Sequence, residues 1–154
     1  MPGGSQLKHE LATGLTMGIT YQVNAPITTD QFIRVLEASS LAERRPVDDR
    51  ECIAEMLANS NLVVSAWTGE QLVGVARSIT DFHYACYLSD LAVAQTYQKL
   101  GIGKRLQAKT QDQLGPKCKL IVIAAPAVNA YYKRLGFTSN PRCWVLARDE
   151  QIRS

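Results

Sequence analysis

The residue types and spacing best suited to chemistry occur where a β-prone segment leads into a loop and then a helix, around Gly101 and Gly103. Two glycines at such a junction let backbone N–H groups approach a bound anion closely. The first N–H groups of a helix lack partners inside it, and the helix dipole adds partial positive charge. With Lys99, Lys104 and Arg105 nearby, the segment predicts a pyrophosphate site, although the same glycine pattern also begins helices that bind nothing.

Two better-known nucleotide-binding motifs are excluded by individual residues. The dinucleotide-binding motif requires a third glycine, and Leu106 occupies that position. The phosphate loop of nucleotide hydrolases requires a glycine where Gln98 stands, and a serine or threonine where Arg105 follows Lys104. The anion site therefore belongs to neither of these motifs.

The elements that position this loop follow from hydrophobic periodicity and capping residues. Strands are expected over Ile19–Val23, Leu62–Trp67, Leu72–Thr80, Tyr84–Val93, Lys119–Ala125 and Trp144–Arg148. Helices are expected from Asp30, capped by Thr28 or Thr29, from Asp48 or Asp49, over Gly101–Leu114 and over about Val128–Leu135. This order predicts an α/β fold with one mixed sheet and helices on both faces. The apolar run Lys119–Ala125 further predicts a strand covered on both sides.

Two segments resemble the motifs of one enzyme superfamily. Gln98-x-x-Gly101-x-Gly103 is similar to the Q/R-x-x-G-x-G/A motif of GNAT acetyltransferases, and residues 131–137 (YYKRLGF) resemble that family's F-Y-x-K-x-G-F signature. One helix and one buried strand are expected between the two motifs, as in the family. The likeness is sharp over about 88–106 and 124–137, and it follows the element order from Met17 to the end of the chain.

The resemblance implies a GNAT fold, which is a mixed, mostly antiparallel sheet with a splayed pair of central strands. It implies acetyl-CoA as cosubstrate, with its pantetheine arm paired to the backbone of Leu91, Ala92 and Val93. It implies that Tyr132 protonates the leaving thiolate, although Tyr131 and Tyr132 are also typical of amphipathic rings that pack in a short helix. It assigns the pyrophosphate to a run of residues: Gln98, Lys99, Leu100, Gly101, Ile102, Gly103 and Lys104.

The sequence departs from the family pattern near the second motif. Many members carry an asparagine at the end of the buried strand, and Asn129 does not align with it. Its contact with the cosubstrate is therefore in doubt, and Pro126 is more typical of a first helical turn.

The general base is open on the sequence alone. Asp90 is the first candidate, as the group that orients a water chain, although strand alternation would equally turn it to solvent. Ser89 lies beside it, and His83 has a suitable intrinsic pKa. Cys86 would suggest a covalent acyl-enzyme, but no Cys/His/Asp arrangement accompanies it.

The predicted function is direct acetyl transfer from acetyl-CoA to the primary amine of a small molecule. The alternatives are a protein lysine or N-terminal acetyltransferase and a non-catalytic acyl-CoA sensor. We expect the acceptor between residues 40–47, the hairpin near Gly69 and the segment Phe82–Tyr87. Arg44, Arg45 and Trp67 are candidate contacts there, although solvated charges and a packed indole are commoner roles.

Composition excludes several other classes of protein. The chain has 154 residues, 46% of them hydrophobic, and a net charge of +3. Its densest basic cluster is Arg44-Arg45, and no apolar run spans a bilayer, so we expect neither nucleic-acid nor membrane partners. Two histidines and four cysteines without CxxC spacing argue against a metal site. Scattered free thiols favour a cytoplasmic location.

Two further expectations concern organisation. Residues 17–154 are expected to form a single GNAT domain, after a dispensable leader over residues 1–16. Self-association into a homodimer is expected through the apolar segment Trp144–Leu146.

Overall fold

The computed structural model describes Gly14 and residues 18–154, so the predicted leader, apart from Gly14, lies outside the described residues. The chain divides into two compact units, one reaching Ile123 and the other spanning Ala124–Ser154.

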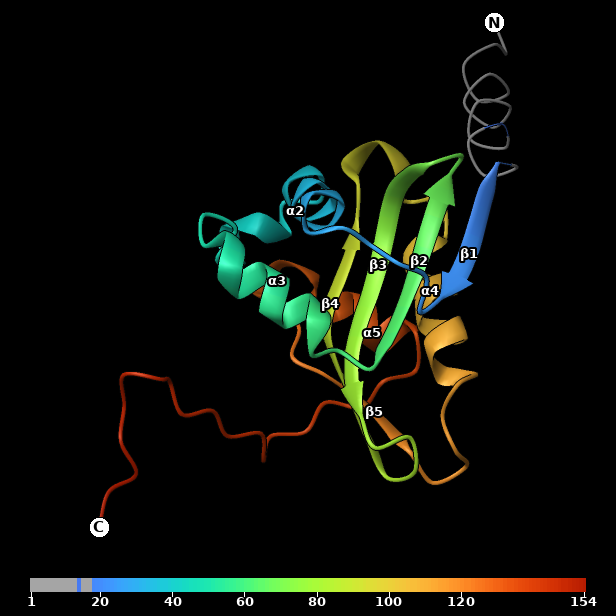
Figure 1. Ribbon diagram of the computed structural model, residues 1–154. Helices are drawn as coiled ribbons and strands as arrows, with labels where there is room; N and C mark the ends of the chain where they lie inside the picture. Colours follow the sequence, from blue (N-terminus) through green and yellow to red (C-terminus); the bar gives the residue numbers. More distant parts are fainter. Residues whose placement is uncertain (1–13, 15–17) are drawn as a thin grey trace, which may run out of the picture. The chain divides into compact units, whose positions relative to one another are not determined.

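The first unit contains a five-stranded sheet in the order β1-β2-β3-β4-β5 (Figure 1). Its strands are β1 (Ile19–Val23), β2 (Leu62–Thr68), β3 (Gln71–Thr80), β4 (Ala85–Val93) and β5 (Lys119–Val122). The first four strands pair antiparallel, and β4 pairs parallel with β5. The predicted mixed and mostly antiparallel sheet is therefore confirmed.

Three helices cover this sheet, and polar side chains begin two of them. Helix α2 (Thr29–Ala38) starts with a capping box, in which the Thr28 hydroxyl accepts from the Gln31 N–H at 3.1 Å and the Gln31 side chain accepts from the Thr28 N–H at 2.9 Å. Helix α3 (Arg50–Ala58) begins after Asp49, whose carboxylate accepts from the Cys52 N–H. Helix α4 (Ile102–Gln111) is shorter than predicted, and 3-10 turns cover Leu41–Arg44 (η1) and Gln95–Tyr97 (η2).

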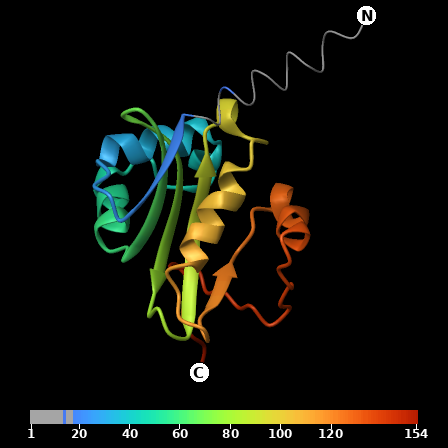
Figure 2. The same cartoon turned by 90° about the vertical axis from the view of Figure 1, so that its right-hand side faces the viewer.

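The helices lie on both faces of the sheet, with α2 and α3 on one face and α4 on the other (Figure 2). Each face has its own apolar cluster. The α2/α3 face buries Phe32, Val35, Leu36, Ile53, Val63, Trp67, Leu72, Val75 and Ala92. The α4 face buries Leu62, Val64, Ala66, Val73, Ala76, Cys86, Leu88, Ile102 and Leu106. Trp67 donates its indole N–H to the Ser65 hydroxyl at 2.7 Å inside the first cluster, so it is a packed core residue and no acceptor contact.

A β-bulge in β4 changes which side chains face which helices. Arg77 pairs with Asp90, but the next residue of β3, Ser78, pairs with Leu88, which leaves Ser89 as the extra residue. Side chains before the bulge therefore alternate out of phase with those after it. As a result Leu88 faces α4, whereas Asp90 faces α2 and α3.

Strand β5 differs from its prediction. Its side chains are alternately exposed and half-buried, and Ile121 is 42% exposed, so the strand is not covered on both faces. Leu120 and Val122 pack against the α4-side cluster. On the other face α2 packs over β3 and β4.

The second unit contains a 3-10 turn, η3 (Pro126–Val128), and helix α5 (Asn129–Arg134). The strand predicted over Trp144–Arg148 is wrong. The Ala147 N–H donates to the Glu150 carboxylate, and the Glu150 N–H donates to the Ala147 carbonyl, both at 3.0 Å. Because this local turn uses the backbone groups that a strand ladder needs, the β-prone side chains do not form a strand. No helix among residues 18–154 is long and apolar enough to cross a membrane.

Candidate active site

Strand β4 has an open edge over its second half. Its pairing with β5 ends at Leu88 and Val122, while β4 continues to Val93. The Ala94 N–H donates to Val73 of β3 at 2.9 Å, whereas the preceding carbonyl, that of Val93, accepts from the Gln98 side chain at 2.8 Å. Backbone groups of successive strand residues point to opposite edges. The backbone groups of Leu91 and Val93 therefore face the open edge, and those of Ala92 face β3.

The loop that follows β4 has the shape of an anion-binding turn. Lys99 and Gly101 both adopt left-handed backbone conformations, with φ of +62° and +83°. The Arg105 N–H, bonded to the Gly101 carbonyl at 3.0 Å, is the first hydrogen-bonded amide of α4. For the six N–H groups from Lys99 to Lys104, the described residues provide no acceptor. Such a run of free N–H groups at a helix start favours a phosphate oxygen.

Glycine is required at Gly101 for its backbone angle and at Gly74 for its size. A Cβ on Gly101 would meet nothing within 4 Å, so only the positive φ selects glycine there. A Cβ on Gly74 would lie 3.2 Å from Leu106 and 3.3 Å from Ile102, both of which anchor α4 in the core. Gly74 thus lets the first turn of α4 approach the sheet closely. Gly74 was not among the residues predicted from the sequence, where its only signal is a glycine inside a strand pattern.

Three exposed cations surround the loop, as the sequence predicted. Lys99, Lys104 and Arg105 are all exposed. The Arg105 guanidinium also lies over the Tyr21 ring of β1, 5.9 Å from its centroid. The loop therefore combines free backbone donors with exposed positive charge, which are the groups that favour a pyrophosphate.

Within the second unit, the end of α5 fixes Tyr132. Gly136 takes a φ of +92°, its N–H donates to the Lys133 carbonyl, and the Phe137 N–H donates to the Tyr132 carbonyl, both at 3.1 Å. These two bonds form a Schellman motif, whose usual apolar contact is the Phe137 ring against the Tyr132 ring at 5.4 Å between centroids. The glycine and phenylalanine of the second sequence motif therefore set the position of the tyrosine.

The hydroxyl of Tyr132 is in a protected environment. Burial raises its pKa above the ordinary value of a tyrosine, and the neighbouring Tyr131 adds to the increase. The Tyr131 ring meets the Tyr132 ring edge to face, with centroids 5.3 Å apart. Tyr132 is therefore protonated throughout the neutral range, as a proton donor must be.

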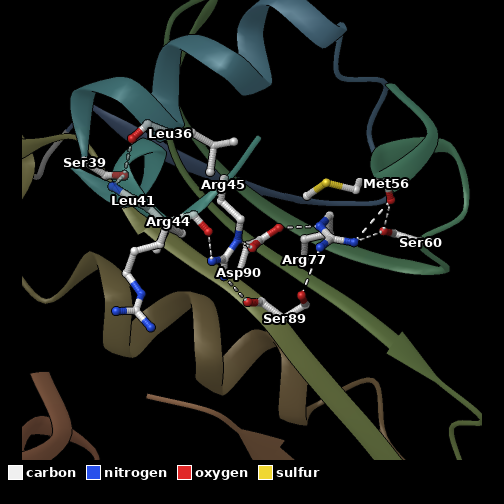
Figure 3. Close-up of polar contacts among 10 residues, drawn as sticks. All are labelled: Leu36, Ser39, Leu41, Arg44, Arg45, Met56, Ser60, Arg77, Ser89 and Asp90. Atoms are coloured by element: carbon white, nitrogen blue, oxygen red, sulfur yellow. Dashed lines mark hydrogen bonds and ion pairs between the residues drawn. The ribbon is translucent and has the colours of Figure 1, made fainter. Parts of the chain in front are cut away.

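Asp90 does not point to solvent. Its side chain is fully buried, and its two carboxylate oxygens pair with Arg45 and Arg77 (Figure 3). Because its side chain is fully buried, direct contact with a substrate amine would require a local rearrangement, which disfavours a direct base role. The catalytic assignment of Asp90 stays a prediction, and the geometry gives the residue a second role as the centre of an ion-pair network.

Of the remaining catalytic candidates, His83 and Cys86 lie outside this network and Ser89 belongs to it. His83 is exposed in the turn before β4, at the opposite end of that strand from the anion-binding loop. The Ser89 hydroxyl accepts from Arg77 at 3.0 Å. Cys86 is fully buried, and burial raises its pKa, so the thiol is a poor nucleophile and the acyl-enzyme alternative is disfavoured. Among the residues that the structure describes, no group of three or more His, Cys, Asp or Glu side chains is arranged to hold a metal.

The prediction that three segments together hold the acceptor is wrong in one respect. The hairpin near Gly69 and the segment Phe82–Tyr87 flank opposite ends of β3, which at ten residues spans about 30 Å. They cannot contact one small acceptor together. Only residues 40–47 reach the middle of β4, through the contact between Arg45 and Asp90.

The comparisons with known proteins agree with this geometry. The family model described as the acetyltransferase (GNAT) domain matches residues 35–142. An uncharacterized ycf52-like N-acetyltransferase of Prochlorococcus marinus is 30% identical over 105 residues, which are 64% of this chain. The chain covers 57% of that relative, so it spans little more than half of the relative's length.

Solved structures share the fold. A GNAT family acetyltransferase from Streptococcus pneumoniae gives a TM-score of 0.63 at 19% identity, over 85% of this chain and 99% of the other. The aminoglycoside N-acetyltransferase AAC(6')-Iy, solved in complex with CoA, gives 0.64 at 16% identity, over 85% and 95%. Since the family model spans well over half of the sequence, this chain belongs to the GNAT acetyltransferase family.

Proposed function

We propose that this protein transfers an acetyl group directly from acetyl-CoA to a primary amine of a small molecule. The observation that carries the proposal is the pair of features at the end of β4. An open strand edge leads directly into a loop with six backbone N–H groups that lack acceptors among the described residues. An extended arm that ends in a pyrophosphate is the ligand that both features fit.

In this proposal strand β4 binds the pantetheine arm, and the loop that follows it binds the pyrophosphate. The backbone groups of Leu91 and Val93 pair with the pantetheine arm. The buried methyl group of Ala92 packs in the apolar cluster on the α2/α3 face and holds the strand in place. The loop holds the pyrophosphate through its free N–H groups and the cationic side chains of Lys99 and Lys104. In our proposal the remaining residues act as follows: Gln98 ties the loop to Val93, Leu100 and Ile102 anchor it, and Gly101 and Gly103 give it access to the phosphates.

The bound cosubstrate supplies an acetyl thioester, so that a C–N bond to the acceptor forms while the C–S bond breaks. The chain's own contribution to this step is a proton at the departing sulfur. We assign it to the hydroxyl of Tyr132, whose raised pKa keeps it protonated and whose ring is held by Phe137. Asp90 acts in this proposal by holding the arginines beside the bulge of β4.

A combined binding and turnover experiment tests the function. Acetyl-CoA should raise the melting temperature of the full chain, because a ligand bound only by the folded state stabilises it. Thiol release should then follow on addition of an amine from a panel of amino acids, polyamines, aminoglycosides and peptides. Release only with peptides would indicate a protein acetyltransferase. A melting-temperature shift with no amine-dependent release would indicate an acyl-CoA sensor and contradict the proposal.

We further propose that the protein self-associates and works in the cytoplasm. Trp144 is 90% exposed and lies beside exposed Val145 and Leu146, which is apolar surface suited to a homodimer contact. Cys52, Cys86, Cys118 and Cys143 are free thiols, which supports a reducing compartment. Light scattering of the parent and a Trp144→Ser variant over a dilution series tests the first proposal, since the variant should dissociate at a higher concentration than the parent.

A further inference from the structure

The network around Asp90 carries more positive than negative charge. Two guanidinium groups, from Arg45 and Arg77, share the single carboxylate of Asp90 (Figure 3). The side chain of Asp90 is fully buried, that of Arg77 is 5% exposed and that of Arg45 is 22% exposed. Two positive charges against one negative leave a surplus of one, held largely out of water. A buried surplus of this kind is costly unless another anion approaches it.

The two arginines differ in what they have left to offer. The guanidinium of Arg77 donates to Asp90, to the Met56 carbonyl at 3.2 Å, to the Ser60 hydroxyl at 2.9 Å and to the Ser89 hydroxyl at 3.0 Å. Its donors are therefore almost all used inside the protein. Arg77 fixes the network in place.

Arg45 keeps part of its donor capacity. Its Nε donates to Asp90, its Nη1 to the Arg44 carbonyl at 2.7 Å and its Nη2 to the Ser89 carbonyl at 2.8 Å. A guanidinium has five N–H donors. With three of them used, two have no acceptor among the described residues. Glu43, the acidic residue on the same segment, forms no ion pair there. Arg45 is partly exposed, so the surplus positive charge of the network is accessible to a ligand at this residue.

Arg45 lies near the place where the thioester of the cosubstrate is expected. This step rests on the proposed function. The arm follows β4 from Val93, next to the pyrophosphate loop, towards the bulge at Ser89. This distance is about 13 Å for four strand residues. Beyond Ser89 the edge is closed by the pairing of Leu88 with Val122. The thioester must therefore lie near Ser89, whose carbonyl is bonded to Arg45.

We infer that the acceptor is an amine that also carries a carboxylate, and that Arg45 recognises this carboxylate. A carboxylate would neutralise the surplus charge and use the remaining donors of Arg45 in charge-assisted hydrogen bonds. Polyamines and aminoglycosides bring further ammonium groups to the same place, where they would be repelled. The favoured acceptors are therefore amino acids and related amino-carboxylates.

The experiment compares acceptors that differ only in the carboxylate. Amino acids and their carboxamides are assayed in pairs by thiol release, with rates referred to the concentration of free amine. The parent protein should prefer the carboxylate member by about tenfold to a hundredfold in kcat/KM, the range expected for charge-assisted hydrogen bonds. Equal rates for both members, or preference for carboxamides, spermidine or an aminoglycoside, would overturn the inference and leave the acetyltransferase function intact.

Substitutions at Arg45 test whether this residue causes the preference for the carboxylate. Arg45→Gln should erase it through a rise in KM for the amino acid only, and Arg45→Lys should retain part of it. The matched control is Arg34→Gln, which removes the same charge from an exposed side chain of α2 outside the network. A thermal shift with CoA shows that each variant is folded. Equal loss of kcat for both acceptors would make Arg45 a group acting on the thioester and would reject acceptor recognition. Absence of release with every acceptor would reject the proposed function as well.

Discussion

Two helix ends in this molecule use a left-handed glycine to opposite effect. Gly101 precedes α4 and leaves a run of N–H groups without acceptors among the described residues, whereas Gly136 follows α5 and its turn uses the local N–H groups internally. The first end is built to bind something external through the backbone. The second is built to hold one side chain, Tyr132. In our proposal the two glycine-containing motifs therefore serve binding and chemistry separately, so substitutions at the two helix ends should affect different measurements.

The largest effect is expected at the end of α5, which holds the side chain of Tyr132. Tyr132→Phe removes the hydroxyl and keeps the ring against Phe137. If the hydroxyl protonates the leaving thiolate, kcat should fall by roughly 10²–10⁴-fold with little change in cosubstrate affinity. Steady-state kinetics with acetyl-CoA and the best acceptor measure this change.

Tyr131→Phe is the matched control for this variant. Adjacent helical side chains point about 100° apart, so its hydroxyl cannot face the same atom, and activity should be retained. Loss of activity in the Tyr131 variant alone would place the donor one residue earlier. The raised pKa of Tyr132 also predicts the pH dependence. The protonated donor is lost only as the pH rises through that raised pKa, so the alkaline decrease in activity should lie above the pH at which an ordinary tyrosine ionises.

The next largest effect is expected at the start of α4, where a substitution should weaken the binding of CoA. Gly103→Val places a branched side chain beside the free N–H groups and should remove the stabilisation by CoA. That stabilisation is about 2.7 kcal/mol at a ligand concentration of 100 times Kd. Gly103 is a sharper target than Gly101, whose positive φ would add strain to the folded state of any variant.

Gly69→Val is the control for this experiment. Unlike Gly103, Gly69 has a positive φ. It lies in the β2–β3 turn, outside the anion-binding loop, where a Cβ would meet nothing within 4 Å. Its variant should melt at a lower temperature and still gain the full CoA shift. A full shift in Gly103→Val as well would show that the phosphates bind elsewhere.

A smaller effect tests whether the Schellman turn positions Tyr132. Phe137→Ala removes the ring contact at 5.4 Å, a pair worth about 0.5–1.5 kcal/mol beyond its buried area. We expect kcat to fall by about tenfold or less while the CoA shift is unchanged. Phe137→Leu, which keeps an apolar side chain, should recover part of the rate. A variant with parental kcat would show that Tyr132 is held by other contacts.

The smallest effect concerns a third backbone anion site, which is filled from within the chain. The Asp81 carboxylate accepts from the N–H groups of His83, Tyr84 and Ala85 at 2.8–3.0 Å. The bonds to Tyr84, Ala85 and His83 lower its pKa from 3.8 to about 2. A lowered folded-state pKa stabilises the protein above pH 4, and this contribution is lost as the pH falls towards 2.

Asp81→Asn tests this assignment through melting temperatures across the pH range. The variant should melt slightly below the parent at neutral pH, and the two curves should converge near pH 2. Because Asp81 is fully exposed, the difference should be small. A difference that persists unchanged at pH 2 would mean that the side chain acts by its shape and not by its charge.

The sequence predicts the order of elements and the anion-binding loop because both depend on local signals. Capping residues such as Thr28 and Asp49 mark helix starts, and the glycines mark the loop before α4. Long-range contacts escape prediction. Nothing local to Asp90 reveals a bulge at Ser89 that turns its carboxylate inward to an arginine 45 residues away. The false strand at Trp144–Arg148 has the same origin, because strand propensity needs a pairing partner that only the fold supplies.

The open edge of β4 also bears on how the protein behaves without its cosubstrate. Unpaired strand edges are templates on which a second chain can add, and they are a common start of aggregation. Here side chains partly protect the edge, since Arg45 takes the Ser89 carbonyl at one end and Gln98 takes the Val93 carbonyl at the other. Leu91 remains between them as an uncovered position. Bound CoA would act as the missing strand, so purified protein should stay dispersed longer when stored with CoA than without it.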